Sequence, residues 1–503
     1  MAADNRKIAK NTMMLYIRML LIMAVTLYTS RVILKVLGIE DYGIYNLIAG
    51  FVTFLVFISN SLVSAMQRYF NVALGQNNPH RYKEVFSMSL NILFLFSVLI
   101  IVLGETIGLW FVHNYLNIPE GRFTAAMWVY QISLLTFVAN TLRTPFHASI
   151  IAHERMSFYA YISIIEVILR LAMVILLMWI PFDHLLMYAF LYLCVIIGVD
   201  LMYIAYCSRK FDVCHYTFKK DRRLFRELIG FSGWSLLGQS AVVVKNQGEA
   251  IFINRFFSVA ANAALGIAGQ VTNAIEMFVS NFQTAFNPQL TQTFAAGNLE
   301  EHHVLLFRSA KFSYYLLLVM LLPVCFNIDT ILALWLEEVP DYTSYFVTFI
   351  LISYLFNALS TPFFTSILAS GNIKYYQIAL CATFAVGLAC IYLILKLGMP
   401  PYSVSIVAIF IQIVLLAIRI FFCKKYVGIS VRKFINDVLL PISLCTIISA
   451  TIPYALGLLA KGTIAALIAL VVDVIVVLGF VFFIGITKTE RASILKMINK
   501  KDK

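Results

Sequence analysis

Long apolar segments recur from one end of the 503-residue sequence to the other, with only short polar stretches between them. About 20 apolar residues in a helix cross the roughly 30 Å of hydrocarbon in a bilayer. Hydrophobic residues make up 61% of the chain and charged residues only 13%, which lies far from the composition of soluble domains. The sequence therefore predicts an integral membrane protein, and no polar gap is long enough for a soluble domain of ordinary size.

The apolar segments predict an all-α membrane protein with fourteen transmembrane helices. Their spacing suits helices with short connections, whereas a membrane β-barrel has segments of about ten residues with alternating polarity. The expected spans are 11–37, 42–63, 85–112, 123–151, 157–180, 185–207, 228–256, 262–285, 306–328, 343–369, 374–396, 401–423, 435–459 and 462–487.

Basic residues are distributed unevenly among the polar connections. Lys and Arg gather in the N-terminal segment, in the connection 208–227 and in the C-terminal tail, whereas the loop around Asp183 has none. Because cytoplasmic loops retain positive charge, both termini are expected in the cytoplasm. The formal net charge of +13 follows from this topology and gives no reason to expect nucleic-acid binding.

The side chains that commonly carry catalysis or bind metals form no recognisable motif. The eight cysteines lie mostly within apolar segments and never as Cys-x-x-Cys, and the eight histidines are dispersed. The adjacent pair His302–His303 has no carboxylate or cysteine at a spacing suited to a metal ion. No nucleophile elbow, phosphate-binding glycine loop or pair of catalytic carboxylates is present. We therefore expect no enzyme, no metal and no cofactor.

One proline-containing phrase occurs twice. Thr144-Pro-Phe-His-Ala-Ser-Ile-Ile-Ala152 in the fourth span matches Thr361-Pro-Phe-Phe-Thr-Ser-Ile-Leu-Ala369 in the tenth at six of nine positions. A weaker match pairs Leu74-Gly75 with Ala296-Gly297, after the second and eighth spans. Spans one to six are therefore expected to be repeated as spans seven to twelve. Because six is even, the two lobes are parallel repeats, which commonly enclose a substrate cavity.

The repeat predicts four segments in the chain. They are an N-terminal lobe with spans one to six, a cytoplasmic linker, a C-terminal lobe with spans seven to twelve, and a final pair of helices with a basic cytoplasmic tail. Their expected bounds are 1–207, 208–227, 228–423 and 424–503.

The prolines of the repeated phrase, Pro145 and Pro362, lie inside expected helices. Each removes one backbone hydrogen bond and bends its helix, and the neighbouring threonine and serine hydroxyls can satisfy the carbonyls that are freed. Two interpretations stay open. The prolines are either static kinks that improve packing, or a symmetric pair of hinges that lets each lobe rock.

Charged residues inside the expected spans are the strongest functional signal, because each costs about 2.5 to 3.5 kcal/mol at the centre of a membrane helix. The segment Lys245-Asn-Gln-Gly-Glu249 is too polar to face lipid. Arg18 and Arg143 are also expected to face a cavity. By contrast, Glu166 and Arg170 are four residues apart and can neutralise one another on one helix face.

Other basic residues lie toward the ends of their spans, so a cavity position and snorkelling to the headgroups stay open as alternatives. These residues are Arg31, Lys35, Arg255 and Arg419.

A cavity with an excess of Arg and Lys indicates an anionic substrate, because guanidinium binds phosphate through paired hydrogen bonds. Phosphate or diphosphate is the natural candidate. Glu249 and Glu276 have two open roles, which are the uptake of H⁺ or Na⁺ in ion coupling and service as counter-ions to Lys245. The residues expected to bind the diphosphate are Arg18, Arg31, Arg143, Lys245 and Arg255.

Several phrases resemble a known family over the whole chain. They are Leu37-Gly-Ile-Glu-Asp-Tyr-Gly-Ile-Tyr45, Gln67-Arg-Tyr-Phe70, Ala148-Ser-Ile-Ile-Ala-His-Glu154 and Asn281-Phe-Gln-Thr-Ala-Phe-Asn-Pro-Gln289. In these phrases the chain resembles the Wzx-type lipid-linked oligosaccharide flippases of the multidrug/oligosaccharidyl-lipid/polysaccharide (MOP) superfamily. The resemblance implies a MATE-like fold of two six-helix lobes plus two helices, and export of undecaprenyl-diphosphate-linked glycans by alternating access. It also implies a basic cavity lined chiefly by the first, second, seventh and eighth spans.

The resemblance further implies a place in the bacterial inner membrane and a role in surface polysaccharide, lipopolysaccharide or O-antigen biosynthesis. The implied partners are a lipid-linked oligosaccharide, membrane lipids and the polysaccharide polymerase machinery. The main alternative is a cation-coupled multidrug (MATE-type) antiporter, which predicts twelve spans and an acidic cavity. A glycan polymerase or ligase would carry a large external loop, and a scaffold would not explain the deep charges.

Overall fold

The computed structural model is helical throughout the residues that it describes, which are 5–53, 56–115, 120–217, 221–257, 259–336, 338–459, 462–488 and 490–492. Within these ranges there is no β-strand. Helices satisfy their own backbone hydrogen bonds, which hydrocarbon cannot do for them. The prediction of an all-α membrane protein is confirmed.

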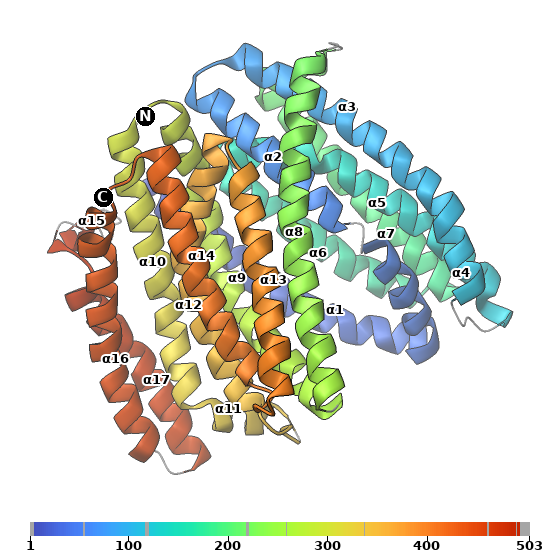
Figure 1. Cartoon of the computed structure of the whole chain (residues 1–503). Helices are drawn as coiled ribbons and strands as arrows, with labels where there is room; N and C mark the ends of the chain where they lie inside the picture. Colours follow the sequence, from blue (N-terminus) through green and yellow to red (C-terminus); the bar gives the residue numbers. More distant parts are fainter. Residues whose placement is uncertain are drawn as a thin grey trace, which may run out of the picture. The chain divides into compact units, whose positions relative to one another are not determined.

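The chain divides into two compact units, each described by itself. The N-terminal unit is Ala9–Leu236, and the C-terminal unit is Leu237–Lys503 together with Met1–Ile8, so the boundary lies within α8. The four predicted segments with boundaries at 207, 227 and 423 stay a prediction. The helices drawn in Figure 1 are α1 (Asn5–Thr53), α2 (Val56–Gly75), α3 (Pro79–Leu103), α4 (Leu109–Tyr115), α5 (Phe123–Ala152), α6 (Met156–Leu177), α7 (His184–Lys210), α8 (Arg222–Phe256), α9 (Val259–Ala295), α10 (Leu299–Phe326), α11 (Ile328–Trp335), α12 (Thr343–Ser370), α13 (Lys374–Lys396), α14 (Ser403–Val427), α15 (Val431–Phe434), α16 (Leu440–Leu459) and α17 (Thr463–Phe480).

Within the described ranges, 11 helices are long and apolar enough to cross a membrane. They coincide with the expected third to seventh and ninth to fourteenth spans. The first span lies on α1, which breaks at Gly38, where φ of 75° and ψ of 172° form a conformation open to glycine alone. The second lies on α1 and α2 and includes residues outside the described ranges, and the eighth lies in the more polar α9. The count of fourteen stays a prediction.

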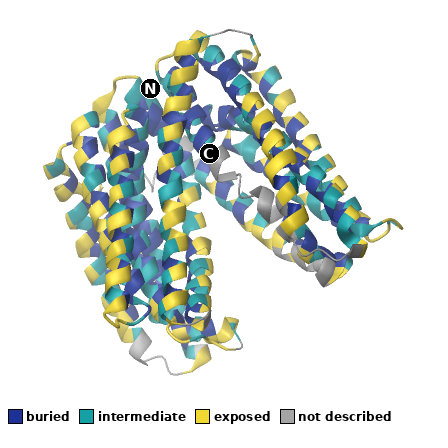
Figure 2. Cartoon of the chain, turned by 45° about the vertical axis from the view of Figure 1, so that its right-hand side comes forward, coloured by how far each residue is buried: buried dark blue, intermediate teal, exposed yellow. Residues whose placement is uncertain are grey.

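The helix that carries the repeated phrase lies at the centre of each unit. In the N-terminal unit α5 packs against α2, α3, α6 and α7. In the C-terminal unit α12 packs against α9, α10 and α14, and α13 packs against α14. In Figure 2 buried residues gather on the inward faces of the helices, and exposed residues follow the outward faces. The packing of the central helix against the helices equivalent to α2, α3 and α7 therefore recurs in both units, as a duplication requires.

Two equivalent contacts set the register between the repeats. Cys207 lies 3.5 Å from the carbonyl oxygen of Phe146, and Cys423 lies 3.2 Å from that of Phe363. The turn after each central helix also has a residue of positive φ at the same place, Glu154 at 55° and Gly371 at 79°. The repeated phrase thus extends into a repeated arrangement of three helices.

The turns after α2 and α9 correspond as well, but the predicted pairing of Gly75 with Gly297 is wrong by two residues. Asn78 and Asn298 cap the following helices, each accepting a hydrogen bond from the backbone N–H three residues later. The residue before each cap has positive φ, 51° at Asn77 and 77° at Gly297. Asparagine tolerates this left-handed conformation nearly as glycine does, so the glycines themselves are not equivalent.

The carbonyl freed by the proline of α12 is satisfied by another helix, contrary to the prediction from the neighbouring hydroxyls. Pro362 leaves the carbonyl of Ala358 without its helical donor, and the Nε2 of Gln283 in α9 lies 3.2 Å from that oxygen. The hydroxyls of Thr361 and Ser366 donate to other carbonyls of α12. A Ser or Thr hydroxyl on a helix donates to the carbonyl four residues earlier. The residue placed to reach the Ala358 carbonyl in this way is residue 362, which is the proline and has no hydroxyl. The hinge role of Pro145 and Pro362 stays a prediction.

Candidate functional site

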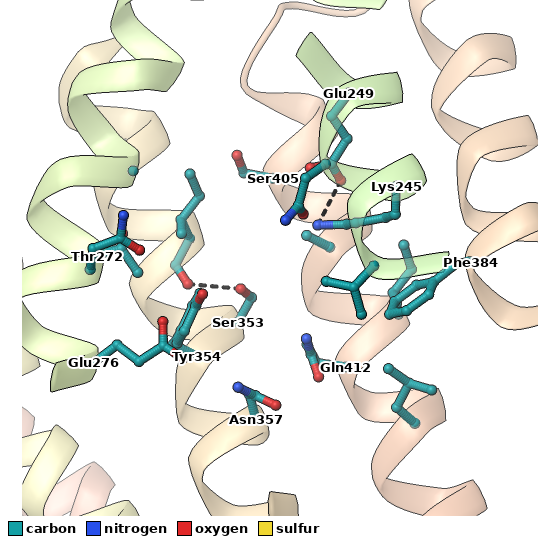
Figure 3. Close-up of a pocket in the computed structure, with 18 of the residues that line it drawn as sticks. Lys245, Glu249, Thr272, Glu276, Ser353, Tyr354, Asn357, Phe384, Ser405 and Gln412 are labelled. Carbon is teal, nitrogen blue, oxygen red and sulfur yellow. Dashed lines mark hydrogen bonds and ion pairs between the residues drawn. The ribbon is translucent and has the colours of Figure 1, made fainter. Parts of the chain in front are cut away.

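The C-terminal unit contains a cavity of about 470 Å³ between α8, α9, α12, α13 and α14. Its lining is strongly polar for a position among membrane-spanning helices, with amide and hydroxyl side chains on several of its walls. Figure 3 shows these side chains converging from different helices on the same space. Four charged residues line it, which are Lys245, Glu249, Glu276 and Arg419.

Lys245 and Glu249 form an ion pair along one face of α8. The lysine Nζ lies 2.9 Å from the Glu249 carboxylate, and the side chains are 16% and 10% exposed. Their spacing of four residues places both on the same side of the helix, and Figure 3 shows them bonded at the cavity wall. Glu249 thus serves as a counter-ion to Lys245, while its role in ion coupling stays a prediction.

Glu276 reaches the cavity from α9. Its carboxylate lies beside the Tyr354 side chain of α12, and in Figure 3 the two groups point toward one another. Within the described residues no cation lies in ion-pair distance of Glu276. Its role in the uptake of H⁺ or Na⁺ stays a prediction.

Arg419 lines the same cavity from α14 and was not among the predicted site residues. Only 7% of it is exposed, its Nε lies 3.0 Å from the Tyr376 hydroxyl, and its Nη1 donates to the Ser360 hydroxyl. The snorkelling alternative is therefore wrong for this residue. The expected span ended at 423, whereas α14 continues to Val427, so Arg419 lies deeper in the helix than the sequence suggested.

In the N-terminal unit Arg143 is enclosed by carboxylates. Its guanidinium lies 3.5 Å from Glu166 and 3.3 Å from Asp200, and its Nη2 donates to the Asn140 side chain at 2.8 Å. The predicted ion pair between Glu166 and Arg170 is confirmed. Arg143 thus lies among charged groups from α6 and α7, and its part in binding a diphosphate stays a prediction.

The other predicted basic residues occupy different surroundings. The guanidinium carbon of Arg18 lies 4.3 Å from the centre of the Tyr159 ring, a cation–π distance, within the N-terminal unit. Arg255 is exposed near the end of α8 and does not line the cavity of the C-terminal unit. The side chain of Arg31 lies outside the described residues. One diphosphate site built from all the predicted residues stays a prediction.

The adjacent histidines have structural partners at helix ends. A ring nitrogen of His302 lies 2.9 Å from the carbonyl of Leu290, and one of His303 lies 2.9 Å from the carbonyl of Val427. Both contacts place an imidazole N–H on a carbonyl near the end of a helix. The part of the chain that the structure describes contains no group of three His, Cys, Asp or Glu side chains suited to a metal ion.

Comparison with protein families gives two matches. A family model described as polysaccharide biosynthesis protein matches residues 6–294, and a model described as MatE matches residues 249–393. The uncharacterized membrane protein EpsK of Bacillus subtilis (strain 168) is 22% identical over 286 residues. That match covers 56% of this chain and 56% of EpsK, so the chain spans little more than half of this relative.

Comparison with solved structures finds MATE transporters. A crystal structure of a MATE mutant has a TM-score of 0.73 at 12% identity, covering 84% of this chain and 97% of that one. The MATE transporter ClbM in complex with Rb⁺ has a TM-score of 0.68 at 17% identity, covering 85% and 96%. A MOP superfamily transporter from Pyrococcus furiosus, described as having a binding pocket of reverse polarity, has a TM-score of 0.66 at 14% identity, covering 85% and 98%. These likenesses show the fold.

Proposed function

The chain belongs to the family of polysaccharide biosynthesis proteins, and from this membership we propose that it is a flippase for a lipid-linked glycan. It carries an undecaprenyl-diphosphate-linked oligosaccharide from the cytoplasmic to the periplasmic leaflet of the bacterial inner membrane, with both chain termini in the cytoplasm. The oligosaccharide serves the biosynthesis of surface polysaccharide or lipopolysaccharide. The MATE fold supports a transport function in general, and membership of the polysaccharide biosynthesis family supports a glycan as the substrate.

The observation that carries the transport proposal is the polar cavity of the C-terminal unit. Charged side chains among membrane helices are costly, and they persist where they line a path for a polar cargo. A void of about 470 Å³ with two cations and two carboxylates on its wall has the character of such a path. It offers hydroxyl and amide groups to a sugar and cations to its phosphates.

The proposed cycle uses alternating access. The diphosphate binds Lys245 in the cavity of the C-terminal unit from the cytoplasm, the protein changes conformation, and the site opens to the outside while the prenyl tail stays in lipid. To accept a phosphate, Lys245 exchanges its bond to Glu249 for one to the substrate. Outward movement of about two negative charges is favoured by roughly 4 to 5 kcal/mol per 100 mV in an inside-negative cell. Return of the empty site completes the cycle, and Glu249 or Glu276 assists it by taking up H⁺ or Na⁺.

Deletion of the gene tests the flippase proposal. The expected result is that lipid-linked glycan accumulates on the cytoplasmic leaflet, measured by its inaccessibility to a membrane-impermeant lectin or oxidant added outside. Re-expression of the chain restores access. If the glycan reaches the outer leaflet at the wild-type rate without this protein, in a cell with no second flippase, the proposal is wrong.

A multidrug antiporter is the second candidate, and two observations favour it. The MatE model matches residues 249–393, and two carboxylates line the cavity, as binding of a cationic drug would require. This function predicts efflux of a cationic dye such as ethidium from energised cells that express the chain. Dye efflux that exceeds that of an empty-vector strain, with no change in lipid-linked glycan after deletion, would replace the flippase proposal.

A further inference from the structure

Each unit places one guanidinium beside the repeated proline phrase, but from different helices. In the N-terminal unit it belongs to Arg143 of α5, whereas the equivalent position of α12 is Ser360, which accepts a bond from Arg419 of α14. The residue of α7 equivalent to Arg419 is Tyr203, whose ring centre lies 5.5 Å from the Arg143 guanidinium carbon. The matched contacts of Phe146 and Phe363 with the cysteines of α7 and α14 fix these equivalences. Arg143 and Ser360 each lie three residues before the phenylalanine of the repeated phrase. Tyr203 and Arg419 each lie four residues before the matched cysteine.

The two guanidinium groups differ in what neutralises them. Arg143 lies near two carboxylates, those of Glu166 on α6 and Asp200 on α7. At the position of α14 equivalent to Asp200 the C-terminal unit has Leu416, and residues 382–384 of α13, which correspond to Glu166, include no carboxylate. The two arginines therefore stand at non-equivalent positions, and neither counter-ion of Arg143 has an equivalent in the C-terminal unit.

Among the described residues, the direct partners of Arg419 are neutral groups. Its guanidinium donates to the neutral hydroxyls of Ser360 and Tyr376, and the ring centre of Phe364 lies 5.5 Å from its guanidinium carbon. No carboxylate oxygen within the described ranges lies within 4.0 Å of its nitrogens. A buried cation whose direct partners are neutral is costly, so an anion that enters this cavity would bind favourably at Arg419.

The carboxylates of the same cavity are already engaged with other residues. Glu249 is bonded to Lys245 on α8, as Figure 3 shows, and Glu276 lies beside Tyr354. The cavity of about 470 Å³ leaves room for a small ligand between these groups and Arg419. The remaining N–H groups of the guanidinium have no acceptor within the described part of the chain.

We propose that this cavity binds an oxyanion, a phosphate or a carboxylate, at Arg419. A guanidinium presents paired N–H donors in a plane, which match the oxygens of phosphate and carboxylate groups better than they match a spherical ion. The oxyanion belongs either to the lipid-linked glycan, in which case the inference rests on the proposed function, or to free phosphate in the cytoplasm. Both sources present the same chemistry to Arg419.

Binding of inorganic phosphate to the purified full-length protein tests the site without any need for transport. The thermal unfolding midpoint is measured against phosphate concentration in detergent, at constant ionic strength set with sodium HEPES. Wild type is expected to show a saturable rise, because a ligand that binds the folded state stabilises it by mass action. Arg419→Gln is expected to weaken phosphate binding about 10- to 100-fold, as loss of a charge-assisted hydrogen bond predicts. An exposed basic residue of the same unit, Lys396, gives the control Lys396→Gln, which should bind as wild type does.

A second variant tests the site with the arginine in place. Leu416→Asp restores a carboxylate where the N-terminal unit has Asp200, and it should neutralise Arg419 and abolish the response to phosphate while the protein stays folded. Arg419→Lys keeps the charge and should retain weakened binding if Arg419→Gln does not fold. An unchanged phosphate response in Arg419→Gln or in Leu416→Asp overturns the proposal.

Competition identifies the source of the oxyanion. A short-chain polyprenyl diphosphate added in the same detergent is expected to displace phosphate from wild type if the site takes the lipid-linked substrate. Absence of competition assigns the site to free phosphate. An unchanged phosphate response in the variants refutes this inference alone, whereas normal flipping after deletion of the gene refutes the proposed function.

Discussion

Breaking the ion pair between Lys311 and Glu490 is expected to loosen the last two long helices from the rest of the C-terminal unit. Lys311 lies on α10, and Glu490 follows α17, so the bond joins segments far apart in the chain. The two side chains are 2.6 Å apart and are 4% and 8% exposed. A hydrogen bond of 2.8 Å from the Tyr315 hydroxyl to the carbonyl of Gly485 lies beside it.

The burial of this pair determines how large the effect should be. Removing one partner of a buried pair leaves the other charge without compensation and costs about 3 to 5 kcal/mol. We therefore expect Glu490→Gln and Lys311→Met each to lower the free energy of unfolding by that amount. The double variant buries no charge at this position, so it should lose much less than the sum of the two single losses.

Equilibrium unfolding in mixed micelles of a mild detergent and sodium dodecyl sulfate measures all four proteins of this cycle. Burial raises the pKa of the Glu490 carboxyl, but hydrogen bonds from Lys311 and from the Thr487 backbone outweigh it and hold the pKa below its ordinary value of 4.5. A lowered pKa in the folded state means that the contribution is complete above pH 4.5 and disappears as the pH falls through the folded value. Single losses below about 1 kcal/mol, or full additivity in the double variant, would refute the reasoning.

Three further predictions follow from the same contacts. Glu249→Gln leaves Lys245 without its counter-ion and should lower the free energy of unfolding by about 3 to 5 kcal/mol, with partial recovery on adding Lys245→Met. The same variant tests the role of Glu249 in ion coupling. If it flips at the full rate in proteoliposomes and responds to imposed ion gradients as wild type does, that role is wrong. Gln283→Leu strips the donor from the carbonyl that Pro362 frees and should cost about 1 to 3 kcal/mol. The cost should shrink in a Pro362→Ala background, where the restored N–H supplies the bond, and an equal cost in both backgrounds would contradict this account. The hinge interpretation expects slower flipping in Pro145→Ala and Pro362→Ala and the slowest in the double variant, whereas unchanged flipping in all three leaves the prolines a packing role alone.

Features that depend on local sequence were predictable without the structure. A bilayer admits few backbone conformations, so length and polarity alone indicate where helices run, and eleven candidate helices lie where they were expected. The repeated phrase indicated two related lobes because identical residues pack the centre of each unit. The polarity of the segment from Lys245 to Glu249 likewise indicated a cavity, which the C-terminal unit contains.

Features that depend on pairing between distant segments could not be obtained from spacing. The sequence by itself determined a helical membrane protein with a duplicated core, because hydrocarbon constrains each segment separately. Only the tertiary structure decided which charges are neutralised: Arg143 meets Asp200 from another helix, whereas Arg419 meets only hydroxyls. The physical reason is that an ion pair depends on the distance in space between two side chains. Helices that pack side by side bring together residues that are far apart in the sequence, and their spacing along the chain does not reveal that distance.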